Sequence, residues 1–89
     1  MKILILTIKK KYFDKIKSGE KKIEYRRYAP YYISRIVGKS YDAIKFINGY
    51  KKDAPMILVE YQGYVIIDCV ETPLGDTKQF AINLGKILK

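Results

Sequence analysis

With 89 residues, 48 % of them hydrophobic, the chain is long enough for one domain over residues 1–89 and too apolar to be disordered. It has no histidine and one cysteine, which excludes an internal disulfide, imidazole-based triads and the usual zinc sites, so we predict no metal and no other cofactor. Residues 1–52 hold 15 Lys and Arg against 4 Asp and Glu, a net +11, whereas residues 53–89 hold 3 against 5; this basic half favours an anionic partner such as nucleic acid, or simply keeps the surface solvated.

The first half of the chain alternates predicted strands and helices. Met1–Ile8 is apolar and β-branched, which predicts a strand buried on both faces. In Lys10–Ser18 the apolar residues gather on one side, which indicates a short amphipathic helix. Lys21–Arg27 is the second predicted strand, and Tyr31–Val37 is a second short helix with Pro30 in its first turn.

The second half is predicted to be all strand. Strands are expected at Tyr41–Ile47, at Met56–Asp68 and at Phe80–Leu84, the last one continuing through residues 85–88. Gly63, inside the longest of them, predicts a bulge or a sharp bend. The order predicts an α+β fold, a small mixed β-barrel of about five strands with two short helices.

The opening strand does not predict membrane targeting. It runs directly into lysines at positions 9–11 and lacks a small-residue cleavage site, so we do not interpret it as a signal peptide. No apolar run approaches the ~20 residues of a membrane span. We expect a cytoplasmic protein with no membrane partner, and the sequence indicates no particular oligomeric state.

The strand at Lys21–Arg27 carries the candidate chemistry. Lys22, Glu24 and Arg26 fall at every second position, so an extended backbone turns them to one face. Glu24 is then a general base, an acceptor for the amino and imino groups of a nucleobase, or half of an internal Glu–Arg pair. Lys21 joins this face only if it lies in the turn before the strand; there it would anchor a ligand, act as a nucleophile, or be solvated.

Arginine and tyrosine residues surround that strand. Arg26 offers a planar fork for phosphate or carboxylate. Tyr28 and Tyr32 are spaced for stacking on unpaired bases or, alternatively, for core packing, and Arg35 would extend a basic rim. Two further residues receive structural interpretations: Glu60 pairs with a cation across the sheet or enters the cleft, and Cys69 is a small buried hydrophobe.

The spacing G-x-K-x-x-E-x-R, held by Gly19, Lys21, Glu24 and Arg26 between an amphipathic helix and a strand, resembles the signature of the ASCH domain, a branch of the PUA-like superfamily. The resemblance implies a PUA-like β-barrel with short helices at its ends. It also implies a cleft between barrel and helices that is lined by the signature residues. Members of the family are proposed to bind RNA or modified nucleosides, and one member has been linked to RNA cleavage.

One branch of that family hydrolyses acetylated cytidine with a lysine, a threonine and a glutamate. Lys21 matches the lysine, but Glu24 stands at the threonine position, and the chain is short between Val70 and Lys78, where Glu71 is a poor match for the glutamate. Because the lysine is kept, the alternative function is a small hydrolase acting on a modified nucleoside or on RNA, using Lys21 and Glu24. A third is an accessory domain that binds an acidic protein.

The favoured prediction is an RNA- or nucleotide-binding domain with a basic cleft. Its predicted ligand-binding residues are Lys21, Lys22, Glu24, Arg26, Tyr28, Tyr32 and Arg35.

Overall fold

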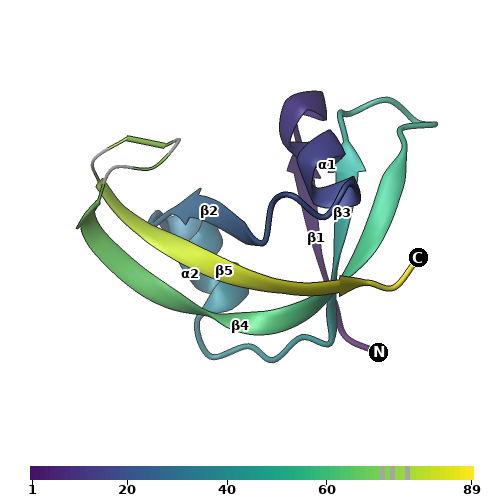
Figure 1. The fold of residues 1–89 in the computed structure, drawn as a ribbon. Coiled ribbons are helices and arrows are strands. Elements are labelled where there is room, and N and C mark those ends of the chain that lie inside the picture. The colour runs from purple at the N-terminus through teal and green to yellow at the C-terminus, as the bar shows by residue number, and fades with distance from the viewer. Residues whose placement is uncertain (71, 73, 76) are drawn as a thin grey trace.

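The computed structural model describes residues 1–70, 72, 74–75 and 77–89. For Cys69 and Val70 it describes the backbone only. Five strands and two helices form the described part of the chain (Figure 1). In chain order they are β1 (Ile3–Ile8), α1 (Lys10–Lys17), β2 (Ile23–Arg27), α2 (Pro30–Ile36), β3 (Ala43–Asn48), β4 (Met56–Val70) and β5 (Thr77–Ile87).

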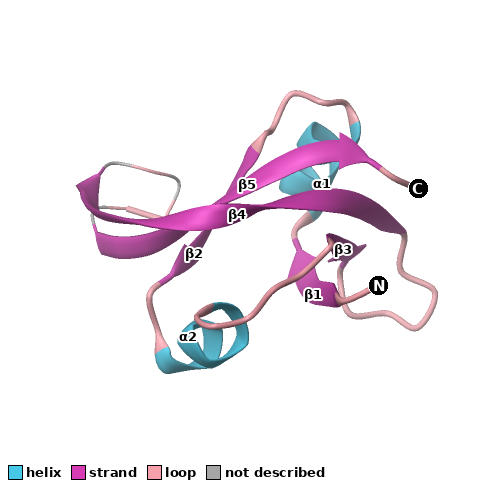
Figure 2. Cartoon of the chain, turned by 90° about the horizontal axis from the view of Figure 1, so that it is seen from below, coloured by secondary structure: helices cyan, strands magenta, loops and turns pink. Residues whose placement is uncertain are grey.

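The strands form one mixed sheet in the order β1-β3-β4-β5-β2. The β1–β3 pair is parallel, as expected when a crossover of helices and strand β2 separates them, and the other three pairs are antiparallel. The long strands β4 and β5 curve together across the molecule, so that the sheet curls into a half-barrel (Figures 1 and 2). The predicted α+β class, the mixed barrel-like sheet and the two short helices are confirmed.

Strand β1 differs from its prediction. Leu4, Leu6 and Ile8 are buried, but Ile5 between them is 56 % exposed. The expectation of burial on both faces was wrong because the core covers only the face of β1 that carries Leu4, Leu6 and Ile8. The apolar run reflects β-propensity on the open face as well as burial on the other.

Bending of β4 produces the curl of the sheet. Gly63 has φ +84°, a left-handed conformation that favours glycine, and the pairing with β5 shifts register between Tyr61 and Tyr64. The predicted bend at Gly63 is thereby confirmed. On β5, Gly85 leaves room for the side chain of Glu60, with which any Cβ at position 85 would overlap.

The core fills the concave side of the sheet. Helix α1 contributes Phe13 and Ile16, which are 4 % and 2 % exposed, and α2 contributes the fully buried Ile36. They pack in one cluster with the strand residues Phe46 and Phe80. Burial of each such side chain contributes about 1.5–3 kcal/mol, so the helices are held to the sheet mainly by these contacts.

The helices begin and end close to where the sequence predicted, and Pro30 is the first residue of α2. Neither helix, among the residues that the structure describes, is long and apolar enough to span a membrane.

Candidate functional site

Two open cavities lie at the seam between the edge strands β1 and β2. The first, here called the motif cavity, has a volume of about 600 Å³ and is lined by Lys21, Glu24 and Arg26 together with residues that end β1 and β3. The second, the edge groove, has a volume of about 580 Å³ and follows β1 from Ile3 to Thr7 beside α2. The two cavities share the lining residues Thr7, Arg26, Tyr32 and Tyr50.

Glu24 lines the motif cavity, and its side chain is only 7 % exposed. Its Oε2 accepts from Nε of Arg26 at 2.7 Å, and the NH2 nitrogen of Arg26 is also 2.7 Å away. Its Oε1 lies 3.4 Å from Nζ of Lys21. A carboxylate has about four lone-pair sites, so Oε1 can accept a further hydrogen bond from a ligand.

Arg26 joins three elements through its guanidinium group. Besides Glu24, NH1 donates to the hydroxyl of Tyr32 and NH2 donates to the carbonyl of Thr7, each at 3.0 Å. Burial by itself lowers the pKa of Arg26, but the charge of Glu24 and the hydrogen bond to Tyr32 outweigh it, so that the pKa lies above its ordinary value. These contacts use most of the five N–H groups, so Arg26 mainly orients Glu24 and closes the seam.

Lys21 takes the place beside Glu24 that the alternating pattern assigned to Lys22. Strand β2 begins at Ile23, and Lys21 lies in the preceding turn, where its N–H donates to the carbonyl of Lys15 at 3.0 Å. Its Nζ lies 5.5 Å from the ring centroids of both Tyr12 and Tyr25. Lys21 was expected to join Glu24 only if it lay in the turn before the strand, and this expectation is confirmed. Lys22 is exposed and lines neither cavity, so its role in binding stays a prediction.

The predicted tyrosine and arginine residues divide between the seam and the core. Tyr32 lines both cavities, and Arg35 lines the edge groove. Tyr28 lines neither: its ring packs at 5.2 Å from that of Phe80, with Nζ of Lys78 4.7 Å from its centroid. The core-packing alternative describes the contacts of Tyr28, and its predicted role in binding stays a prediction.

The match to a family model supports the resemblance that the motif suggested. The model of the ASCH domain matches residues 6–79, which is most of the chain. The chain belongs to the ASCH domain family. Comparison with curated proteins and with solved structures found no match.

Sequence reasoning missed several residues that line the motif cavity of this ASCH domain. Thr7 was predicted only as part of the apolar strand Met1–Ile8, and Asn48, just after the predicted strand Tyr41–Ile47, was given no role. Tyr12 belongs to the helix predicted over Lys10–Ser18 and was given no role in the site, although its ring both packs against the core and lines the cavity. Thr7 and Asn48 come together through the parallel pairing of β1 with β3, which places Ile8 opposite Asn48 and which no local pattern reveals.

The remaining predictions concern Glu60, Glu71 and Cys69. Glu60 accepts from Nε2 of Gln62 at 3.1 Å and lines neither cavity. Among the described residues between Val70 and Lys78, Leu74 lines the motif cavity. Glu71 and the side chain of Cys69 lie outside the described residues, so the predictions made for them are untested.

Proposed function

We propose that this ASCH domain binds RNA or a nucleotide-like ligand in the motif cavity. The observation that carries the proposal is the nearly buried carboxylate of Glu24, oriented by Arg26 and Lys21 toward a cavity of about 600 Å³. A fixed carboxylate accepts paired donors, such as the amino group of cytosine or the amino and imino groups of guanine. The rings of Tyr12 and Tyr25 in the same wall offer surfaces for a planar base.

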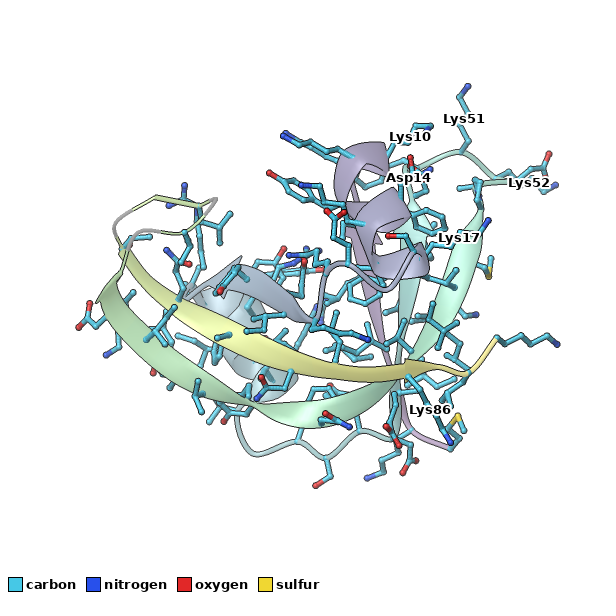
Figure 3. The ribbon with its side chains drawn as sticks, in the orientation of Figure 1. Lys10, Asp14, Lys17, Lys51, Lys52 and Lys86 are labelled. Atoms are coloured by element: carbon cyan, nitrogen blue, oxygen red, sulfur yellow. The ribbon has the colours of Figure 1, made fainter. Side chains whose placement is uncertain are left out.

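The rim of the motif cavity supports the same proposal. Lys9 and Lys10, at the start of α1, belong to its lining. Lys51, in the loop after β3, lies at the same end of the molecule as Lys10 (Figure 3). A phosphate group attached to a bound base would meet Lys9 and Lys10, of which Lys10 also pairs with Asp14 at 2.6 Å. Membership of a family that is generally RNA-binding also supports the proposal.

Fluorescence anisotropy with a labelled single-stranded RNA tests the proposal. We expect micromolar or tighter binding at low salt that weakens steeply as salt rises. Glu24→Gln should weaken binding about tenfold or more, because it removes a charged acceptor. The matched control is Glu20→Gln, at a glutamate whose side chain is 67 % exposed. Near-UV circular dichroism of each variant shows that a loss of binding is not a loss of fold.

Three outcomes would reject the proposal. The first is the absence of binding to RNA, DNA and nucleosides alike at low salt. The second is equal weakening by Glu20→Gln and Glu24→Gln. The third is complete displacement of RNA by polyglutamate at an equal concentration of charge, which would favour an acidic protein partner.

The hydrolase alternative is supported by one contact, the 3.4 Å separation of Lys21 Nζ and Glu24 Oε1 inside the motif cavity. Against it, Glu24 replaces the threonine of the hydrolase branch, and the wall near the shortened segment presents Leu74. Incubation with acylated nucleosides and with RNA tests it. Turnover that is lost in both Lys21→Ala and Glu24→Ala would establish the hydrolase; we expect none. We further propose that residues 1–89 act as one domain and that the protein is cytoplasmic.

A further inference from the structure

The edge groove adjoins the motif cavity and is lined in part by aromatic and cationic side chains. It follows the open edge of β1, and its lining includes Tyr31, Tyr32 and Arg35 from α2. It meets the motif cavity at Arg26, Tyr32, Thr7 and Tyr50, which line both. A chain of nucleotides that leaves the motif cavity in this direction would pass these shared residues and enter the groove.

Aromatic rings and guanidinium groups form a continuous series along this route. The Cζ atom of Arg26 lies 5.6 Å from the ring centroid of Tyr32. The rings of Tyr31 and Tyr32 meet edge to face at 5.0 Å, and the Cζ atom of Arg35 lies 4.1 Å from the centroid of Tyr31. The series therefore reaches from the residue that orients Glu24 to the surface of α2.

The outer pair of this series contributes little to the folded core. Tyr31 is 58 % exposed, and Arg35 is exposed one helical turn later. The ion pairs found among the described residues do not include Arg35, so its charge is not neutralised by a neighbouring carboxylate. An exposed tyrosine stacked with an unneutralised guanidinium presents a planar, cationic surface of the kind on which unpaired bases stack.

We propose that the edge groove binds a second nucleotide, with its base stacked on Tyr31 and Arg35, while the first occupies the motif cavity. The ligand is then a single-stranded oligonucleotide rather than a free nucleoside. This inference rests on the proposed function, because it assigns a neighbouring nucleotide to the same strand. It goes further by naming the class of ligand and the direction in which the strand leaves Glu24.

Binding measured against ligand length tests the inference. A mononucleotide and a tetranucleotide of the same base are titrated, as RNA and as DNA, by calorimetry or anisotropy at one salt concentration. We expect the tetranucleotide to bind roughly 5- to 150-fold more tightly, the range given by one added base–aromatic stack. A gain in affinity with length for RNA alone would mean that the protein also recognises the ribose. A gain for both RNA and DNA would mean that the bases and phosphates suffice.

Substitutions in the edge groove separate stacking from general charge. Tyr31→Ala and Arg35→Ala should each remove most of the gain with length and leave mononucleotide binding within about twofold, whereas Tyr31→Phe should keep the gain. Lys86→Ala removes the same charge as Arg35→Ala from a lysine on β5 that lines neither cavity (Figure 3). In Lys86→Ala the gain in affinity from mononucleotide to tetranucleotide should stay close to that of the wild type.

Each result has a defined meaning. Equal affinity for both lengths, with binding still dependent on Glu24, would overturn the second site and leave the proposed function intact. An equal loss in Lys86→Ala and Arg35→Ala would also overturn it, because the gain would then be a matter of net charge. If neither length binds at low salt, the proposed function and this inference both fail.

Discussion

Arg26 on β2 donates a hydrogen bond to the backbone carbonyl of Thr7 on β1 at 3.0 Å, and thereby joins the two edge strands of the curled sheet. In a closed barrel, backbone hydrogen bonds would join those edges along their length. Here a side chain makes the connection at one point and leaves a cavity on either side of it. Both candidate ligand sites therefore depend on the barrel being incomplete.

Replacement of Arg26 should lower the free energy of unfolding more than replacement of a surface arginine does. Arg26→Met leaves Glu24 largely buried with Lys21 as its remaining cation and removes the link to Thr7. We expect a loss of about 3 kcal/mol in the free energy of unfolding, the lower end of the range of about 3–5 kcal/mol for breaking a buried ion pair. Urea denaturation measures it, with Arg27→Met, at an exposed neighbour, as the control.

A double variant checks the origin of that loss. Glu24→Gln combined with Arg26→Met removes both charges, so it should be more stable than Arg26→Met alone. If the double variant is less stable than Arg26→Met, the cost does not come from the charge left on Glu24. If Arg26→Met and Arg27→Met lose the same free energy of unfolding, the contacts of Arg26 with Glu24 and Thr7 contribute little to stability.

Lys9 offers a prediction in which stability and binding change in opposite directions. It is the N-cap residue of α1, with an extended backbone (ψ 149°) and no side-chain hydrogen bond, and the first turn of the helix has no acidic residue. A cation there opposes the helix dipole, whereas Asp caps it. Lys9→Asp should therefore raise the free energy of unfolding by about 1 kcal/mol.

The same change should weaken RNA binding, because Lys9 lines the motif cavity. Lys86→Asp, with the same change in charge outside both cavities, is the control for binding. Urea denaturation and anisotropy measure the two effects on one preparation. A more stable variant with unchanged affinity would indicate that the ligand does not approach across the start of α1.

Local patterns predicted the elements because each depends on near neighbours in sequence. The amphipathic spacing of α1, Pro30 at the start of α2 and the bend at Gly63 are all properties of a few adjacent residues. The pairing of Glu24 with Arg26 was also foreseeable, since alternate residues of a strand share a face.

What the sequence did not reveal depends on boundaries and on long-range pairing. Whether Lys21 or Lys22 meets Glu24 is decided by the residue at which β2 begins. Thr7 and Tyr50 enter the site because β1 and β3 pair side by side and because β1 is an edge. A run of apolar residues has the same composition whether one or both faces of its strand are covered, so the burial of β1 was overestimated.

The bend at Gly63 should tolerate only residues that accept a left-handed backbone. A Cβ at this position would meet no atom within 4 Å, so the cost of substitution is conformational. Gly63→Ala should lower the free energy of unfolding by about 1–2 kcal/mol. Gly63→Asn should cost less and Gly63→Val more, an order that urea denaturation can establish. Equal stability of the three variants would mean that β4 bends without this conformation.

Tyr61 predicts how stability changes at alkaline pH. Desolvation by burial, followed by the neighbouring Tyr64 and Tyr41, raises the pKa of Tyr61 above the ordinary value of 10.0. The folded state then holds the phenolic proton at pH values where the unfolded chain has lost it. The resulting stabilisation is fully present below about pH 10 and is lost as the pH rises through the pKa of the folded state.

The slope of stability against pH isolates this contribution. Between about pH 9.5 and 11 the free energy of unfolding should fall more steeply in the wild type than in Tyr61→Phe, because only the wild type has this phenol to ionise. Tyr50→Phe, at a tyrosine that is 93 % exposed, should keep the wild-type slope. Chemical denaturation at several pH values gives the slopes directly, and any constant effect of the substitution cancels. Parallel curves for the wild type and Tyr61→Phe would show that Tyr61 has the same pKa in the folded and unfolded states.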